Sequence, residues 1–199
     1  MKKLLCALFA LGAVAAFAAD APKNLIVNGE LKINEKGRLT GWEYPRKNSF
    51  ILNNDNTIGL KEGFQGYSSY WVTRVQVKPF VSYKLEFEYK AENIGKMAGV
   101  YYIWSDAEGK KLANERFALK LNPGSTDGWV KCSQVLSQSN PVKTARLNLC
   151  FALYNASGEG KIFFRNISLT AVGGDSEDDD DDTPPAAAPA KPAAPEKKK

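Results

Sequence analysis

The residues from 82 to 91 alternate between apolar and polar side chains without a break, and this pattern constrains the fold more than any other feature of the sequence. A period of two residues is that of a β-strand with one buried and one solvated face. The apolar positions are Tyr83, Leu85, Phe87 and Tyr89, and the polar positions are Lys84, Glu86, Glu88 and Lys90. The segment therefore predicts a half-buried strand.

Further short segments with strand patterns follow, and residues typical of turns separate them. No segment shows the period of an amphipathic helix. Many short strands joined by Gly, Pro and Asn turns predict an all-β fold, namely a β-sandwich jelly roll of two antiparallel sheets. We expect the other strands at residues 70–78, 100–105, 112–119, 129–136, 146–154 and 161–169, with turns at 106–109, 122–124 and 126–128.

The last of these strands contains a break in its alternation. Ile162 and Phe164 share one face, and Ile167 and Leu169 share a face that is out of phase with the first pair. A β-bulge inserts one extra residue and so returns a strand to its original phase. We therefore expect a bulge at residues 165–166.

The chain divides into three parts. Residues 1–18 contain two lysines, an apolar run from Leu4 to Phe17 and an Ala-x-Ala site ending at Ala18. This pattern predicts a cleaved secretory signal peptide, with a buried N-terminal helix as the alternative. The run is too short for a transmembrane segment. We expect a secreted or periplasmic protein with one jelly-roll domain at residues 19–173.

The third part, residues 174–199, is an acidic run followed by a stretch of Pro, Ala and Lys. Such a composition cannot bury enough apolar surface to offset the entropy of ordering, so we expect a disordered tail. Two roles remain open. The tail is either a solubilising segment or a tether whose lysines contact an anionic envelope surface.

Composition excludes several classes of function. The sequence has no histidine, which excludes histidine general bases and histidine-ligated metals, and none of its three cysteines forms a Cys-x-x-Cys pair. The net charge is +5, but the basic residues are scattered, so nucleic acid is not an expected partner. Glu86 and Glu88 alternate with lysines on one strand face, which is typical of a charge-paired exterior rather than of catalytic carboxylates. We expect no enzyme activity.

Seven short segments in a fixed order carry a resemblance to a known family. They span residues 24 to 169 and hence nearly the whole domain. They are residues 24–31 (NLIVNGEL), 41–42 (GW), 83–91 (YKLEFEYKA), 104–110 (WSDAEGK), 128–129 (GW), 145–149 (ARLNL) and 160–169 (GKIFFRNISL). This ordered set resembles carbohydrate-binding modules of families 4, 9 and 22. The resemblance implies a galactose-binding-like jelly roll that recognises a polysaccharide or oligosaccharide.

The sequence departs from that family at the positions that help to hold a structural calcium. Acidic residues are usual there, whereas this chain has Leu31-Lys32 and Arg165-Asn166. Calcium prefers several carboxylate oxygens. We expect no cofactor and an absent or weakened calcium site, for which Glu30 and Asn166 are the remaining oxygen ligands. A second expected departure from the family is a lone module without an attached catalytic domain.

Aromatic rings that stack on sugars and polar groups that bond hydroxyls make up a carbohydrate site. The resemblance places Trp42, Trp129, Tyr83, Phe87 and Tyr89 in the core, and strand phase adds Trp71 and Trp104. The opposite faces of these strands carry a second set of aromatic and polar residues. These residues form a groove if their strands share a concave sheet, and otherwise they form an ordinary solvated face. These candidate ligand-binding residues are Tyr70, Arg74, Gln76, Tyr101, Asn148 and Tyr154.

Two cysteines remain after signal cleavage, Cys132 and Cys150. An exported protein with two cysteines more often pairs them, so a disulfide is favoured over two separate small apolar side chains. The sequence thus predicts a monomeric, non-catalytic carbohydrate-binding module. The alternative is a structural or protein-interaction module of the cell envelope that keeps the jelly roll without sugar binding.

Overall fold

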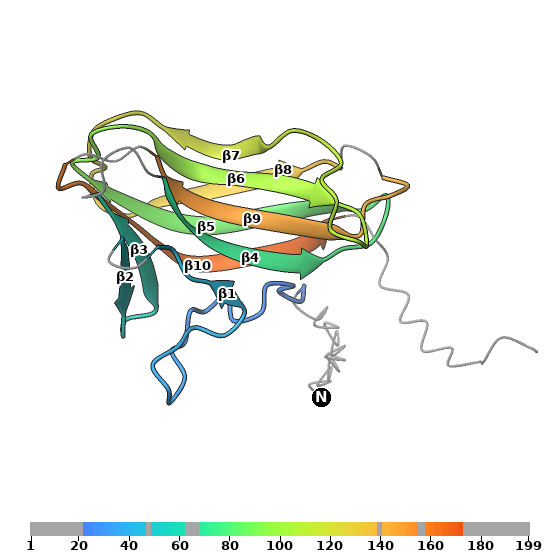
Figure 1. Cartoon of the computed structure of the whole chain (residues 1–199), viewed down its shortest axis with the longest axis horizontal. Coiled ribbons are helices and arrows are strands. Elements are labelled where there is room, and N and C mark those ends of the chain that lie inside the picture. Colours follow the sequence, from blue (N-terminus) through green and yellow to red (C-terminus); the bar gives the residue numbers. More distant parts are fainter. Residues whose placement is uncertain (1–21, 47–48, 63–67, 139–140, 155–157, 173–199) are drawn as a thin grey trace, which may run out of the picture.

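The computed structural model describes residues 22–46, 49–62, 68–138, 141–154 and 158–172, and these form a sandwich of two antiparallel sheets (Figure 1). The described residues contain no helix. The predicted all-β sandwich is therefore confirmed. The predicted signal peptide and tail lie outside the described residues.

Each sheet has five strands, and the chain crosses repeatedly between the two sheets. The first sheet has the order β1 (Trp42–Glu43), β4 (Ser69–Gln76), β9 (Arg146–Leu153), β6 (Ala98–Ser105) and β7 (Arg116–Leu121). The second sheet has the order β2 (Phe50–Asn53), β3 (Thr57–Lys61), β10 (Lys161–Val172), β5 (Ser82–Glu92) and β8 (Val130–Leu136).

Most strands lie where the alternation predicts them, and the exceptions have local causes. The strand expected at residues 112–119 begins later, at Arg116, because residues 106–110 form a tight turn and Lys111 forms an isolated bridge with Ser105. Strands β1, β2 and β3 were not predicted. In β3, residues 57–60 are all buried, so no alternation marks them in the sequence.

Aromatic side chains from both sheets fill the core. Phe151 of the first sheet packs against Phe164 and Phe87 of the second, with ring centroids 5.0 and 5.7 Å apart. Trp71 is fully buried, and its Nε1 donates a 2.9 Å hydrogen bond to the Gly59 carbonyl of the other sheet. Of the seven aromatic residues predicted to be core, six are buried: Trp42, Trp71, Tyr83, Phe87, Tyr89 and Trp104.

The seventh, Trp129, is only half-buried, and its assignment to the core is wrong. The guanidinium of Arg165 lies over its ring, 4.1 Å from the centroid. Arg165 also donates a 2.7 Å hydrogen bond to Glu88. Because Glu88 projects from the solvated face of β5, this cation–π contact lies on the outer face of the second sheet.

The bulge in β10 is confirmed. The pairing of β10 with β5 shifts between Arg165 and Ser168, and Asn166 has a φ of 52°. A short polar side chain such as that of Asn tolerates this left-handed conformation. The extra residue turns both apolar pairs of the strand into the core, where all four side chains are buried: Ile162, Phe164, Ile167 and Leu169.

The segment that opens the domain forms hydrogen bonds with β10 at this bulge. These contacts account for the asparagine at position 24 and the glycine at position 29. Asn24 donates to the Ile167 carbonyl (2.9 Å) and accepts hydrogen bonds from the amides of Leu169 (3.0 Å) and Ile26 (3.1 Å). The carbonyl of Gly29 accepts from Ile167 N, and a Cβ on Gly29 would overlap the Ile167 carbonyl oxygen. Only glycine permits so close an approach of two backbone segments.

The predicted disulfide is not formed. Both cysteines are free thiols on different sheets, Cys132 on β8 and Cys150 on β9. Cys132 pairs with inward-facing Phe87 and packs against the core, whereas Cys150 pairs with Val72 and Tyr101 on the outer face of the first sheet. Burial raises the pKa of both thiols. Each cysteine instead occupies a separate site as a small apolar side chain, which is the alternative to the disulfide that the sequence left open.

Candidate functional site

The outer face of the first sheet brings together all six residues that the sequence singled out. Tyr70, Arg74 and Gln76 alternate along β4 with buried Trp71, Thr73 and Val75. Neighbouring β9 contributes Asn148, which pairs with Arg74, and it ends just before Tyr154. The next strand, β6, contributes Tyr101. Alternation along three adjacent strands therefore aligns these side chains on one face.

One half of this face is aromatic. The ring of Tyr101 is the centre of a cluster, with the rings of Tyr70, Tyr154 and Phe117 at centroid distances of 6.4, 6.1 and 6.2 Å. Tyr70 and Phe117 are about two-fifths exposed. We call these four residues the aromatic half. It offers exposed ring surface that can stack on the C–H face of a sugar.

The surroundings of Tyr101 and Tyr154 favour the protonated form of both hydroxyl groups. Burial raises the pKa of Tyr101 and of Tyr154 above the ordinary range of tyrosine, and the neighbouring Cys150 thiol raises both further. Small residues of β9 lie between Tyr70 and Tyr101, because Ala152 pairs with Tyr70 and Cys150 pairs with Tyr101. The hydroxyls of Tyr101 and Tyr154 thus remain available as hydrogen-bond donors at neutral pH.

The other half of the face is polar, and we call Arg74, Gln76, Arg146 and Asn148 the polar half. Arg74 forms an ion pair with Glu43 of β1. Asn148 donates a 3.0 Å hydrogen bond to the buried Ser105 hydroxyl, which orients its amide. The Nε of Arg146 is buried and has no hydrogen-bond partner among the described residues. The exposed side chains of Arg74 and Gln76 are the donors of this half that a ligand with hydroxyl groups could reach.

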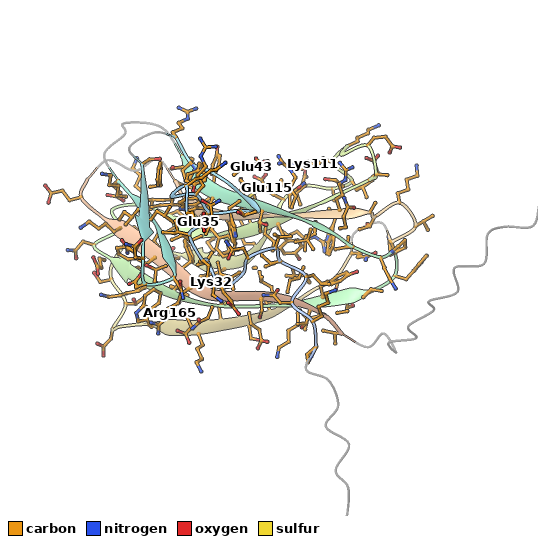
Figure 2. All side chains as sticks on the ribbon, turned by 90° about the horizontal axis from the view of Figure 1, so that it is seen from below. Lys32, Glu35, Glu43, Lys111, Glu115 and Arg165 are labelled. Carbon is orange, nitrogen blue, oxygen red and sulfur yellow. The ribbon has the colours of Figure 1, made fainter. Side chains whose placement is uncertain are left out.

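Figure 2 shows the charged groups that border this face. Glu43, Lys111 and Glu115 lie on the side of the first sheet, and Arg165 lies on the opposite side of the sandwich. Lys111 and Glu115 form a 3.6 Å ion pair between exposed side chains. The aromatic and polar halves are therefore flanked by exposed, mutually compensated charges.

Sequence reasoning missed three residues of this face: Phe117, Arg146 and Glu43. Simple alternation places Phe117 on the same side as Leu119, but the β6–β7 pairing shifts so that Tyr101 faces Phe117 and Val100 faces Leu119. The shift leaves Ala118 unpaired and turns Phe117 outward. Arg146 was detectable, because it precedes Asn148 by two positions on the same strand. Glu43 belongs to β1, a strand of two residues that is too short to recognise in the sequence.

The position at which the sequence resemblance implied a calcium site does not fit that ion. A pocket of about 420 Å³ contains Glu30 and Asn166, and Glu30 is the only carboxylate among the described residues that line it. Lys32 forms a 2.5 Å ion pair with Glu30 and holds the pKa of that carboxyl below its usual range. Arg165 turns away to Glu88. One carboxylate that is already paired is a poor calcium site.

We therefore expect thermal melting of the domain to change by less than about 1 °C on addition of a chelator. A calcium site occupied at 100 times its dissociation constant would contribute about 2.7 kcal/mol, or roughly 5–10 °C for a domain of this size. Differential scanning calorimetry with chelator, and then with excess calcium, checks this expectation. A drop of several degrees that calcium reverses would contradict it.

Comparisons with known proteins agree with this fold. No family model matches the chain, and no curated protein matches its sequence. Among solved structures, a family 4 carbohydrate-binding module has a TM-score of 0.51 at 14% identity, with 74% of this chain and 99% of that one covered. The module TmCBM61, solved with β-1,4-galactotriose, has a TM-score of 0.50 at 14% identity, with 75% and 99% covered.

An enzyme chain has the same sandwich as a part. The enzymatically active domain of tailspike protein 4 from bacteriophage CBA120 matches with a TM-score of 0.56 at 15% identity. The match covers 75% of this chain and only 21% of the tailspike chain, so the likeness is to one portion of that protein. The chain therefore has the β-sandwich fold of carbohydrate-binding modules, as the ordered motifs indicate. Among the described residues, no helix is long and apolar enough to cross a membrane.

Proposed function

We propose that this protein is a secreted, non-catalytic carbohydrate-binding module whose ligand lies along the outer face of the first sheet. One observation carries the proposal: the aromatic half and the polar half adjoin on one face of four neighbouring strands, β4, β9, β6 and β7. A sugar ring stacked near Tyr101 would place its chain over β9, within reach of Asn148 and Arg146. Stacking and hydroxyl recognition would then act on one extended ligand.

The absence of catalysis is part of this proposal and rests on the chemistry of the face. Its described carboxylates, Glu43 and Glu115, each form an ion pair with a neighbouring cation. Glycoside hydrolysis uses two carboxyl groups on opposite sides of the scissile bond, one of them protonated. Two separately paired, exposed carboxylates do not suit that role.

A second candidate function is a structural or protein-interaction module of the cell envelope. The ion pair between Arg74 and Glu43 and the hydrogen bond between Asn148 and Ser105 favour it, because they satisfy these groups without a ligand. The exposed rings of Tyr70 and Phe117 favour the sugar-binding function instead, because no partner within the described residues covers them. A glycan array probed with the full chain separates the two functions.

The replacement Tyr101→Ala is expected to weaken retention on an insoluble polysaccharide that binds the protein by about threefold to tenfold. This range corresponds to the loss of one aromatic stacking contact, roughly 0.5–1.5 kcal/mol. Depletion of the protein from solution by the insoluble polysaccharide measures the effect, and circular dichroism confirms the fold of the variant.

The matched control is Trp129→Ala, which removes a half-buried aromatic ring from the outer face of the second sheet. We expect this control to bind the polysaccharide as the native protein does. Equal loss in both variants, or unchanged retention after Tyr101→Ala and Arg74→Ala, would exclude the outer face of the first sheet as the binding site.

A further inference from the structure

A groove of about 420 Å³ lies at the edge of the first sheet, beside the C-terminal end of β4. One wall is the opening segment, residues 23–27, and the other wall is residues 74–76 of β4. The edge strand β1 pairs only with Val72 and Thr73, so it does not cover this part of β4. The groove is therefore open to solvent at a place where the sheet has no outer strand.

The charged side chains that line this groove are cations. Among the described residues that line it, the charged ones are Lys23 and Arg74, and both are exposed. Lys78 is exposed just beyond the end of β4. Arg74 is paired with Glu43, whereas Lys23 forms no ion pair within the described part of the chain. The groove thus suits an anionic group.

The acidic residues of the surroundings do not cancel this charge. Asp106 and Glu108 lie on the turn that follows β6, and the strand order places β9 between β6 and β4. Two strand spacings are about 10 Å, on the side of β4 away from β1. Asp20 precedes Lys23 by three positions and lies outside the described residues. The predicted cleavage after residue 18 would add an N-terminal ammonium group next to it.

The last strand brings the chain to the same place. Figure 1 shows that β4 and β10 finish at the same end of the sandwich. The Leu25 amide donates a 2.9 Å hydrogen bond to the Leu169 carbonyl, and the Ile167 amide donates to the Gly29 carbonyl at 3.3 Å. The opening segment therefore runs antiparallel to β10. Lys23 lies toward the C-terminal end of that strand.

An acidic sequence begins three residues after β10 ends at Val172. Residues 175–182, DSEDDDDD, contain seven carboxylates and no basic residue. Three extended residues span about 10 Å, and eight more span about 25 Å, so this segment can reach both Lys23 and Arg74. Residues 19–173 contain 21 basic and 14 acidic residues. The domain as a whole therefore attracts the segment.

We propose that the acidic segment, residues 175–182, binds in this groove of its own domain, with its carboxylates paired to Lys23 and Arg74. A short connection gives the segment a millimolar effective concentration at the groove, so exposed ion pairs that are weak singly give partial occupancy. A second copy of the chain would supply its segment only at the much lower concentration of the protein in solution. The occupant is therefore the chain's own segment.

The bound segment competes with a sugar ligand, because Arg74 and Gln76 line the groove and also belong to the polar half. This competition rests on the proposed sugar-binding function, whereas the contact between segment and groove does not. A glycan that reaches the polar half displaces the carboxylates. Salt screens exposed ion pairs, so it releases the segment as well. The acidic segment thereby lowers the affinity for polysaccharide at low ionic strength.

NMR spectra of the full chain without its signal peptide test the contact in the absence of sugar. The comparison variant has Asn or Gln in place of all seven carboxylates of residues 175–182, at unchanged length. At low salt we expect the amide signals of the two proteins to differ mainly at residues 23–27 and 74–76. We expect the differences to shrink in about 0.5 M NaCl.

Two lysine variants make this measurement specific. Lys23→Gln removes the unpaired cation of the groove, and we expect it to reduce the difference between the native and neutralised segments. The matched control is Lys161→Gln, which changes an exposed lysine at the opposite end of β10. We expect this control to leave the difference unchanged, because the groove keeps both of its cations.

Retention on an insoluble polysaccharide that binds the protein tests the competition. The variant with the neutralised segment is expected to bind about threefold more tightly than the native chain at low salt, and equally in about 0.5 M NaCl. Deletion of residues 183–199 is the matched control, because it shortens the chain and keeps the acidic segment. We expect this deletion to leave the affinity unchanged.

Three results would overturn the proposal. Equal amide signals at residues 23–27 and 74–76 in the native and neutralised proteins would refute the contact. Signal differences that grow with protein concentration would place the segment on a second copy of the chain. A contact that leaves polysaccharide affinity unchanged would refute the competition. If the native chain binds no polysaccharide, the proposed function and the competition fail together, and the NMR spectra still decide the contact.

Discussion

Replacement of Trp71 by alanine is expected to lower the free energy of unfolding by about 3–5 kcal/mol, a large share of the stability of a small domain. Trp71 is fully buried, and its ring packs at centroid distances of 4.8 Å from Tyr44 and 5.5 Å from Phe50. Its indole nitrogen also satisfies the Gly59 carbonyl of the opposite sheet. The replacement leaves a cavity and an unpaired buried acceptor together.

Urea denaturation followed by tryptophan fluorescence measures this loss, and Trp129→Ala is the matched control. Both replacements remove one indole, but Trp129 is half-buried and contacts solvent-side Arg165. We expect the control to cost about 1 kcal/mol. Similar losses in the two variants would contradict the placement of Trp71 in the core and Trp129 on the surface.

Replacement of Gly29 by alanine is expected to cost roughly 3 kcal/mol. The new Cβ would meet the Ile167 carbonyl oxygen and the Asn24 amide nitrogen, which bond each other. Relief of the clash requires the opening segment to move off the bulge of β10, and the hydrogen bonds of Asn24 would lengthen with it. We expect the loss to appear as a fall of several degrees in melting temperature.

The matched control is Gly37→Ala, where no atom lies within 4 Å of the added Cβ. Gly37 has a φ of 70°, so alanine there costs only the backbone preference, about 1 kcal/mol. If Gly29→Ala were as mild as Gly37→Ala, the close contact between the opening segment and β10 would be refuted. Calorimetry of both variants under one set of conditions makes the comparison.

The aromatic half shows how far strand phase alone can predict a binding face. Alternation placed Tyr70, Tyr101 and Asn148 opposite the core, and the structure has them there. Alternation does not show which strands are neighbours. The sequence therefore predicted that Tyr101 lies near Tyr70 and Tyr154 only on the condition that their strands share one sheet. Phe117 was missed because a shift in pairing between β6 and β7 reverses its side.

The cysteines show the limit of arguments from residue count. Two cysteines in an exported chain favour a disulfide in general, but the rule contains no geometry. Cys132 belongs to the second sheet and points inward, while Cys150 belongs to the first sheet and points outward. Only the assignment of each strand to a sheet separates the two thiols. Trp129 directly precedes β8 and is out of phase with inward-facing Val130 and Cys132, so it lies on the outer face of the second sheet beside Arg165.

Residue pattern was sufficient to predict the all-β class, the core-facing side of most strands and the bulge in β10. These features depend on a period of two residues, which can be recognised along a single strand. The strand order, the union of the aromatic and polar halves on one face and the hydrogen bond between Phe80 and Gln138 arise only when the strands assemble. Those features join residues far apart in the chain, as in the separation of 58 positions between Phe80 and Gln138. Contacts between segments so far apart depend on how strands pair and twist, and no local periodicity records that.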